Sequence, residues 1–586
     1  MNSFDTRKAF LDFFVSKGHK EVKASSLIPT DESVLFTTAG MQQFKPYFLG
    51  EKSPYGNMVT TCQKCMRTSD IDNVGDVNHL TFFEMLGNFT FGQYFKKEAI
   101  QYAYEFLIDT LKLPKDRIWI TYFKGDKDVE KDEESIKIWK ELGISEDRMI
   151  GFSREDNFWG PTGNEGPCGP TTEIHYDLTG INCSLGDKCL PNCSCKRYVE
   201  IWNLVFNEFY QDKGKKLTPL KQNGVDTGMG LERLCMALQG KTSLFETDLF
   251  DGIIKEIEKV SGKKYEDFQS SFRIIADHLK SAMFLIEAGI LPGKNDREYI
   301  LRRILRRAIR HAKNIGLKDF NSILEKIFDI YEDIYPEIIA GKERIISVID
   351  EEKLKFEKTL EKGLKEFEKL SSINSEKAFY LYESYGFPIE LTIELAKEKN
   401  INVDLKEFDD LQKKHQEISR AGAQKKFGGL GIDMVENEND RKEMTKLHTA
   451  THLLHQALRQ ILGEEVKQMG SDINPERLRF DFSFKRKLEK EELEKIENLI
   501  NEKIKEGLEV KKEEMKYEDA IKSGALAFFK EKYPEIVNVY SIGNFSKEIC
   551  AGPHVDNISE LKCVKILKEE AVGAGVRRIK IKLNNC

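Results

Sequence analysis

Residues 65–92, CMRTSDIDNVGDVNHLTFFEMLGNFTFG, are the most informative stretch of the chain. Arg67 precedes a polar loop, and the loop leads to His79 and then to Phe83 in an aromatic, apolar run. A planar guanidinium can bind phosphate oxygens through two hydrogen bonds at once, and an aromatic face can stack on a nucleotide base. Because an arginine, a loop and a phenylalanine in this order are structural in most proteins, the stretch needs support from a second segment.

That support comes from GVDTGMGLERL, residues 224–234, which predicts a strand that ends in glycines and leads into a helix near Arg233. Gly228 and Gly230 would let the backbone approach a nucleotide closely. A carboxylate that attacks an α-phosphate needs fixed cationic donors to stabilise the developing charge, and arginines provide them. The glycine pattern alone is weak evidence, but the two segments together favour nucleotidyl transfer from ATP.

Short runs rich in aromatic and β-branched residues surround these two segments. WITYF (residues 119–123), TEIHYDL (residues 172–178) and VEIWNLVFNEFYQ (residues 199–211) are typical of strands. Their irregular spacing, with helices between them, predicts an α+β domain over residues 1–243, built on a mainly antiparallel sheet.

A helical pattern follows over residues 244–425. In ILRRILRRAIRHAKNIG, residues 300–316, the apolar residues recur at helical spacing and form one stripe. The same helix carries a second, basic stripe that suits nucleic-acid phosphates, although a solvated helix face is the more ordinary interpretation. The apolar stripe comprises Ile300, Leu301, Ile304, Leu305 and Ile309, and the candidate phosphate-binding residues are Arg302, Arg303, Arg306, Arg307 and Arg310.

The last part of the chain predicts another α+β domain. Residues 426–444 combine glycines with polar residues and indicate a linker. Thr445 is a candidate N-cap for the helix LHTATHLLHQALRQILG, residues 447–463, and strand-like runs follow it. Residues 445–586 are therefore expected to form the third domain.

Two groups of residues have the composition of metal sites. His448 and His452 are four residues apart and share one helix face, and Cys550 with His554 forms a second pair. Three imidazoles and a thiolate suit Zn²⁺. An isolated pair of this kind is more often two unconnected histidines, but two pairs together favour metal binding.

The second group is a cluster of cysteines in a loop of the N-terminal domain. Four thiolates could close a structural zinc knuckle, and the alternative is a set of unconnected loop thiols. Clustered cysteines in a large cytosolic protein favour metal ligation over disulfides. The four are Cys183, Cys189, Cys193 and Cys195.

Composition limits the class of protein. The net charge is −7, 40% of residues are hydrophobic and 32% are charged. A nucleic acid would therefore have to bind at local basic patches. No apolar run approaches the ~20 residues needed to span a bilayer, and the N-terminus lacks the apolar core of a signal peptide. We expect a cytoplasmic protein.

Taken together, the two informative segments resemble motifs 2 and 3 of class II aminoacyl-tRNA synthetases, and residues 25–50 resemble motif 1. The similarity to alanyl-tRNA synthetases is closer still, and it covers residues 82–100, 157–177, 198–211 and 225–233 in order. The resemblance implies an antiparallel class II sheet flanked by helices, then an all-helical tRNA-recognition domain, then an α+β editing domain.

The same resemblance implies roles for single residues. Arg67 and Arg233 would be the catalytic cations, with Arg67 at the α-phosphate and Arg233 and His79 at the terminal phosphates. Phe83 would stack on adenine, and Mg²⁺ would accompany ATP. The implied alanine-binding residues are Trp159, Asn203, Val205 and Asp226.

An enzyme that selects alanine is expected to make errors. One methylene is worth only about 1–3 kcal/mol of discrimination, and an apolar pocket rejects an added hydroxyl weakly. Glycine and serine should therefore be attached to tRNA(Ala) by mistake. The resemblance assigns their hydrolytic removal to the domain with the His/Cys quartet and adds Gln468 as a polar contact. Whether Zn²⁺ would activate water or position the esterified adenosine stays open.

The resemblance also implies that the helical domain reads a G·U wobble pair through an Asn and an Asp. Lys294 stands where Asn is expected, with Asn295 beside it, and Glu383 stands where Asp is usual. We therefore expect either recognition with altered geometry or a different cognate tRNA.

The implied function is that of an AMP-forming alanine–tRNA ligase that also edits. The sequence has no counterpart of the family's usual β-barrel insert and C-terminal oligomerisation domain, which favours a monomer. Two alternatives stay open: an editing-only protein with a decayed synthetase domain, and an AMP-forming ligase for another acceptor. Arg67, Asp226 and Arg233 count against the first, and the arginine-rich helix and the editing domain count against the second.

Overall fold

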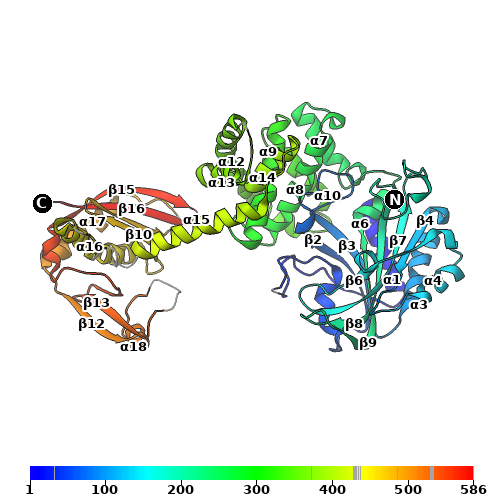
Figure 1. Cartoon of the computed structure of the whole chain (residues 1–586), viewed down its shortest axis with the longest axis horizontal. Helices are drawn as coiled ribbons and strands as arrows, with labels where there is room; N and C mark the ends of the chain where they lie inside the picture. The colour runs from blue at the N-terminus through cyan, green and yellow to red at the C-terminus, as the bar shows by residue number, and fades with distance from the viewer. Residues whose placement is uncertain are drawn as a thin grey trace. The chain divides into compact units, whose positions relative to one another are not determined.

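A computed structural model describes the chain except for residues 32, 371, 427–431, 433–434, 436, 485, 528–532, 574, 585 and 586. The chain divides into two compact units (Figure 1). The first unit comprises Met1–Ile373 and Tyr380–Ile401, and the second comprises Asn374–Phe379 and Asn402–Cys586. Among the described residues, no helix combines the length and the apolar character that crossing a membrane requires.

A nine-stranded sheet forms the centre of the first unit, in the order β1-β2-β3-β9-β8-β7-β4-β5, with β6 paired to β7. The central pairs are antiparallel, and only the edge pairs β1–β2 and β4–β5 are parallel. The mainly antiparallel sheet expected from the sequence is confirmed. The strands are β1 (Lys20–Glu21), β2 (Met58–Met66), β3 (Phe82–Phe91), β4 (Ile118–Phe123), β5 (Met149–Phe152), β6 (Phe158–Trp159), β7 (Gly166–Asp177), β8 (Tyr198–Gln211) and β9 (Leu217–Gly230).

Aromatic packing joins the N-terminal helix to this sheet. Phe10 and Phe14 of α1 (Ser3–Ser16) lie against Trp202 of β8, with ring centroids 5.7 and 6.1 Å apart, and Phe106 closes the cluster. Because these rings are buried, they fix the middle of β8, which carries residues of the cavity described below. Further helices on the sheet are α2 (Lys45–Phe48), α3 (Lys96–Tyr104), α4 (Glu133–Glu141), α5 (Arg154–Asn157) and α6 (Leu231–Leu238).

Helices α7 to α15 follow the sheet along the chain. The apolar stripe expected on α9 is confirmed, because all five of its members are buried. Nearly every residue of α8 is buried as well, which makes α8 the central helix of this region. The helices are α7 (Asp251–Ser261), α8 (Gln269–Glu287), α9 (Asp296–Asn314), α10 (Asn321–Tyr331), α11 (Glu337–Ala340), α12 (Lys342–Lys369), α13 (Ser375–Tyr385), α14 (Ile389–Glu398) and α15 (Leu405–Lys426).

The second unit has the expected α+β composition. A long helix, α16, packs against a four-stranded antiparallel sheet in the order β10-β11-β16-β15, and a separate sheet has the order β12-β13-β14. The elements are α16 (Glu438–Leu462), β10 (Gln468–Asn474), β11 (Arg477–Ser483), α17 (Lys490–Glu506), β12 (Val510–Lys516), α18 (Tyr517–Lys522), β13 (Ile536–Ile542), β14 (Ser546–Ile549), β15 (Cys563–Gly573) and β16 (Val576–Asn584).

The start of α16 differs from the expectation. The side chain of Asn437 accepts hydrogen bonds from the backbone N–H groups of Asn439 and Asp440, so Asn437 is the N-cap. Thr445 lies inside the helix, where its hydroxyl donates to the carbonyl of Arg441. The prediction of a cap at Thr445 is wrong, and residues 438–444 of the expected linker are helical. Residues 427–431, 433–434 and 436 of that linker lie outside the described residues.

Candidate functional site

One cavity of about 560 Å³ opens in the first unit beside the central strands of the sheet. The sequence singled out ten residues for ATP and alanine, from segments far apart in the chain, and all ten line this cavity. They are Arg67, His79, Phe83, Trp159, Asn203, Val205, Asp226, Gly228, Gly230 and Arg233.

Strand register is the reason that these residues converge. On the neighbouring strands β8 and β9, Asn203 lies opposite Gly228 and Val205 lies opposite Asp226. Side chains alternate between the two faces of a strand, so these paired positions point to one face of the sheet. A slip by one residue would turn the whole set to the opposite face.

Asp226 is a buried carboxyl group whose environment suits the binding of a cation. Burial raises the pKa of Asp226 to about 7. Among the described residues, no lysine, arginine or histidine forms an ion pair with it. A bound ammonium group would favour the charged carboxylate and lower this pKa. The position is therefore suited to an α-amino group.

The two arginines are held at separate places in the cavity wall. The guanidinium of Arg67 lies 5.0 Å from the ring centroid of Phe83 and 5.7 Å from that of Trp159. Arg233 donates from Nη1 to the backbone oxygen of Glu200, at 3.2 Å, and to its Oε2, at 3.1 Å. Since both guanidinium groups have fixed neighbours, the cavity offers two preorganised cations.

His79 is oriented by a carboxylate that the sequence did not reveal. Asp76 accepts from His79 Nδ1 at 2.7 Å through Oδ2, and its Oδ1 accepts from the backbone N–H groups of Asn78 and His79. Burial opposes ionisation of Asp76, but these hydrogen bonds outweigh burial and lower its pKa to about 2. A permanent negative charge therefore orients the imidazole.

Sequence reasoning missed other polar residues of the cavity, among them Glu173, His175 and Glu200. Glu173 accepts from Asn203 Nδ2 at 2.6 Å and lies 3.2 Å from His175 Nε2. Burial, helped by the charge of Glu200, raises the pKa of Glu173. An acid and an imidazole two residues apart in TEIHYD share one strand face, and that spacing was the available signal.

The second unit brings together the quartet His448, His452, Cys550 and His554. One ligand atom from each of the four lies within 4.8 Å of the others. Cys550 Sγ is 3.4 Å from His448 Nε2. The histidines of one turn of α16 thus meet the loop after β14, which the sequence spacing alone could not establish.

Neighbouring groups orient the three imidazoles for metal binding. His448 Nδ1 donates to the carbonyl of Pro553 at 2.9 Å, and His452 Nδ1 lies 3.2 Å from Glu548 Oε2. Thr449 donates its hydroxyl to a helix carbonyl, so His554 Nδ1, 3.2 Å away, donates to Thr449. The rings of His448 and His554 then offer an unprotonated Nε2, as metal-binding histidines do. This donor set fits Zn²⁺.

Gln468 is not joined to the quartet by a hydrogen bond among the described residues. It begins β10, and its amide donates to Ser471 Oγ at 3.1 Å. Its role as an editing contact remains a prediction.

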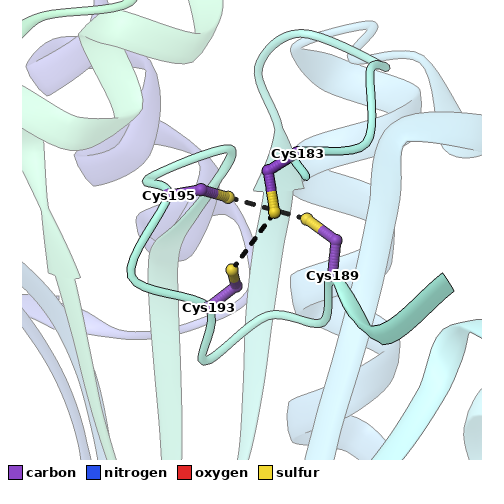
Figure 2. Close-up of side chains that lie close together, drawn as sticks. All are labelled: Cys183, Cys189, Cys193 and Cys195. Atoms are coloured by element: carbon purple, nitrogen blue, oxygen red, sulfur yellow. Dashed lines mark hydrogen bonds between the residues drawn. The ribbon is translucent and has the colours of Figure 1, made fainter. Parts of the chain in front are cut away.

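The four loop cysteines also come together, as Figure 2 shows. Cys183 Sγ lies 3.8 Å from Cys193 Sγ, and Cys189 Sγ lies 3.6 Å from Cys195 Sγ. All four sulfur atoms are within 4.8 Å of one another, without a disulfide. Four converging thiols in one short loop fit a structural Zn²⁺ better than the alternative of unconnected thiols.

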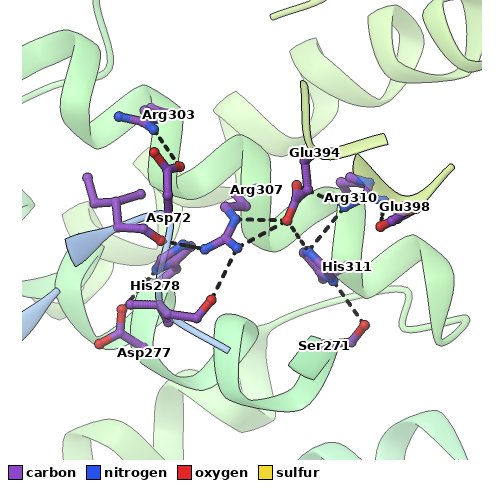
Figure 3. Close-up of polar contacts among 12 residues, drawn as sticks. Asp72, Ser271, Asp277, His278, Arg303, Arg307, Arg310, His311, Glu394 and Glu398 are labelled. Atoms are coloured by element: carbon purple, nitrogen blue, oxygen red, sulfur yellow. Dashed lines mark hydrogen bonds and ion pairs between the residues drawn. The ribbon is translucent and has the colours of Figure 1, made fainter. Parts of the chain in front are cut away.

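The arginines of α9 require a correction. The side chains of Arg307 and Arg310 are only 11% and 2% exposed, and both pair with Glu394 of α14 (Figure 3). Arg303 pairs with Asp72, and Arg306 pairs with Glu352 of α12. The expected phosphate-binding stripe therefore does not include Arg307 and Arg310, because both side chains are buried and paired with acids of α14.

The two positions expected to read a wobble pair are both exposed. Asn295 immediately precedes α9, and Glu383 lies in α13. Their assignment to tRNA remains a prediction.

Comparison with known proteins agrees with this architecture. A family model described as "tRNA synthetases class II (A)" matches residues 5–473, and one described as "Threonyl and Alanyl tRNA synthetase second additional domain" matches residues 537–580. The antiparallel sheet, its cavity and these matches define a class II tRNA synthetase.

Similar proteins with known names identify the family within this class. The chain is 47% identical to alanine–tRNA ligase of Borrelia hermsii over 98% of each chain, and 47% identical to that of Treponema denticola over 99% of each. It is 40% identical to the Thermotoga maritima enzyme over 99% of this chain and 80% of that one. The chain belongs to the alanine–tRNA ligase family.

Proposed function

We propose that this protein activates alanine with ATP, transfers it to the 3′ end of tRNA(Ala) and hydrolyses Ser-tRNA(Ala) and Gly-tRNA(Ala). The observation that carries the proposal is the single cavity that holds Asp226, Arg67 and Arg233 together. Asp226 supplies a site for the ammonium group, and the two arginines supply sites for phosphates.

The cavity suits in-line transfer of the adenylyl group. The alanine carboxylate attacks the α-phosphorus, the bond to the β-phosphate oxygen breaks, and pyrophosphate leaves. Arg67 stabilises the charge on the α-phosphate, while Arg233 and His79 bind the departing phosphates. Phe83 stacks on adenine. Mg²⁺ bound to ATP would neutralise phosphate charge, and the cavity carboxylates Glu173 and Glu200 are oxygen ligands of the kind that it takes.

Side-chain selection belongs to the same cavity. Val205 and Trp159 restrict the space around the alanine methyl group, and Asn203, held by Glu173, orients the substrate. Restriction excludes larger side chains but discriminates weakly against glycine and serine. In a second step, the terminal ribose hydroxyl of tRNA attacks the alanyl carbonyl, and AMP leaves.

The quartet in the second unit is proposed to hold Zn²⁺ for editing. When bound there, Zn²⁺ would either polarise water or position the esterified adenosine. His448, His452, Cys550 and His554 supply the ligands, and the Pro553 carbonyl and Thr449 fix two of the rings. Water then cleaves the ester bond between the wrong amino acid and the ribose.

Recognition of tRNA is proposed for exposed and partly exposed groups of the helical region. Asn295 and Glu383 would contact the acceptor stem of the tRNA. Arg302, Arg303 and Arg306 would contact its phosphates. We propose a monomer that acts in the cytoplasm. Replacing the G·U pair of a tRNA(Ala) transcript should lower its charging rate, and unchanged charging would contradict this assignment.

Alanine-dependent exchange between ATP and pyrophosphate is the direct test of activation. An editing-only protein would show no exchange. A ligase for another acceptor would show exchange but would not charge purified tRNA(Ala). Exchange together with charging is the expected result.

The KM for alanine is expected to depend on pH through Asp226. The free carboxyl has a pKa of about 7, and pairing with the substrate ammonium lowers it. Below that pH, a proton must leave before alanine binds, so the KM should rise about tenfold for each pH unit. Above it, the KM should level off. Exchange kinetics from about pH 5.5 to about pH 8 measure this, with the KM for ATP as the internal control. A flat alanine profile would contradict the assignment.

Asp76→Asn is expected to raise the KM for ATP about tenfold while leaving the KM for alanine unchanged. The amide keeps an acceptor for the backbone but loses the charge that orients His79. Asp72→Asn is the matched control, because Asp72 lies in the same loop, is exposed and pairs with Arg303. Equal effects of the two substitutions would exclude a specific role for Asp76.

A further inference from the structure

The loop between Arg67 and β3, residues 68–81, is held mainly by helices rather than by the sheet. Arg273 of α8 donates to the carbonyl of Gly75 at 3.2 Å, and Asp277 of α8 accepts from the backbone N–H of Thr81 at 2.9 Å. Asp70, Asn78 and His79 of this loop line the cavity. Anything that moves the loop therefore moves one wall of the ATP site.

Arg307 makes the most extensive of these contacts. Its Nη1 donates to the carbonyl of Ile71 at 2.6 Å, and its Nη2 donates to the carbonyl of Val74 at 3.1 Å. The two carbonyls are three residues apart, and one planar guanidinium binds both. An ammonium group of lysine lacks this fork and could not reproduce both bonds in the same geometry.

Partners on two other helices fix the guanidinium itself (Figure 3). Arg307 Nε donates to Glu394 Oε1 of α14 at 3.1 Å, and Nη1 lies 3.2 Å from His278 Nε2 of α8. His278 Nδ1 donates to Asp277 at 2.9 Å, so its Nε2 is the acceptor for Arg307. Burial lowers the pKa of His278, which keeps the ring neutral in that role.

Glu394 supplies the negative charge that this buried arginine requires. Burial opposes its ionisation, but the hydrogen bond from His311 and the charges of Arg307 and Arg310 hold its pKa well below the usual range. A buried arginine without such a partner would be strongly destabilising. The contacts of Arg307 with Glu394 and with the loop carbonyls therefore connect α14 and α9 to loop 68–81.

We propose that Arg307 is a positioning residue of the ATP site. It fixes loop 68–81, and so His79 and the approach to Arg67, without touching the substrate. The inference rests on the proposed function, because it takes the cavity to be the ATP site. It separates Arg307 from Arg302 and Arg306, which lie on the same helix but are proposed to act on tRNA.

Exchange kinetics without tRNA test the inference. Arg307→Lys is expected to raise the KM for ATP about tenfold and to leave the KM for alanine within about twofold, since Asp226 and Val205 are on the sheet. Arg310→Lys is matched for helix, burial and the Glu394 partner, but among the described residues no hydrogen bond or ion pair joins Arg310 to the loop. It should lower the melting temperature to a similar extent and leave the KM for ATP within about twofold.

Arg344→Lys is a second control, because Arg344 also donates to two backbone carbonyls, those of Ile286 and Glu287, away from the loop. Its kinetics should match the wild type. An unchanged KM for ATP in Arg307→Lys, or an equal rise in Arg310→Lys, would overturn the inference. Absence of exchange in the wild type would instead overturn the proposed function.

Gly75→Ala disturbs the same loop at another point and tests the inference independently if Arg307→Lys fails to fold. Gly75 has a φ of +122°, and a Cβ there would lie 2.6 Å from Ser270 Oγ. The substitution pushes the loop away from α8, so the KM for ATP should again rise while that for alanine does not. An equal KM for ATP in the wild type and in Gly75→Ala would show that the position of the loop does not control ATP binding.

Discussion

Arg67→Ala is expected to reduce alanine-dependent ATP–pyrophosphate exchange by about a thousandfold. The guanidinium is the cation assigned to the α-phosphate, where charge builds up as the alanine carboxylate attacks. Its loss should lower kcat more than it raises the KM for alanine, because Asp226 still binds the ammonium group. Arg67→Lys keeps the charge without the fork and should recover only part of the rate.

Arg117→Ala provides the matched comparison for Arg67. Arg117 lies in the same unit, is half-buried and donates to a backbone carbonyl, that of Leu178, but it does not line the cavity. Its exchange rate should stay within about twofold of the wild type. If Arg67→Ala retained more than a tenth of the wild-type kcat, the assignment to the α-phosphate would be wrong.

Cys550→Ala is expected to lower the rate of Ser-tRNA(Ala) hydrolysis at least about a hundredfold and to remove one equivalent of bound zinc. The thiolate is the only anionic ligand of the quartet, so three neutral imidazoles would hold the ion weakly. Activation of alanine is proposed for the cavity of the other unit and should persist. Because activation persists while hydrolysis is lost, Ser-tRNA(Ala) should accumulate when tRNA(Ala) is charged with serine. Stability to trypsin or heat need not change.

Cys62→Ala is the control for this experiment, because Cys62 is a free cysteine outside both metal clusters. It should keep the full zinc content and the full deacylation rate. Two equivalents of zinc in the wild type and one in Cys550→Ala would also support metal binding by the four loop cysteines. Normal deacylation by a Cys550→Ala protein that lacks the zinc would exclude a metal-dependent editing site.

Local sequence was sufficient to predict those features of the fold and of the site that depend on the type of side chain. The strands around Trp119, His175 and Trp202 were identified from aromatic and β-branched residues, because those residues pack well in a buried sheet. The ten cavity residues were named from two short segments and a family resemblance. Glu173 was missed because its importance comes from a contact with Asn203 across a strand pair.

The predictions from sequence were wrong where charged residues that are far apart in the chain lie together in the folded protein. In the sequence, the five arginines of α9 have no acid nearby after Glu298, which favoured a phosphate-binding stripe over a solvated helix face. In the structure, Glu394 lies against Arg307 and Arg310, and Glu352 lies against Arg306. The prediction of a cap at Thr445 was wrong for a different reason. Asn437 lies further upstream and caps the helix, so the helix begins before Thr445.

The sequence by itself determined which chemistry this protein can perform, since that depends on the kinds of donors it carries: arginines and a carboxylate for adenylate formation, and imidazoles with a thiolate for zinc. Only the tertiary structure decided which of those groups are available. Whether an arginine binds a ligand or a loop carbonyl depends on what lies within a few ångströms of its guanidinium, and chain folding sets that distance. Arg67 and Arg307 are the same residue type, yet one faces the cavity and the other holds its wall.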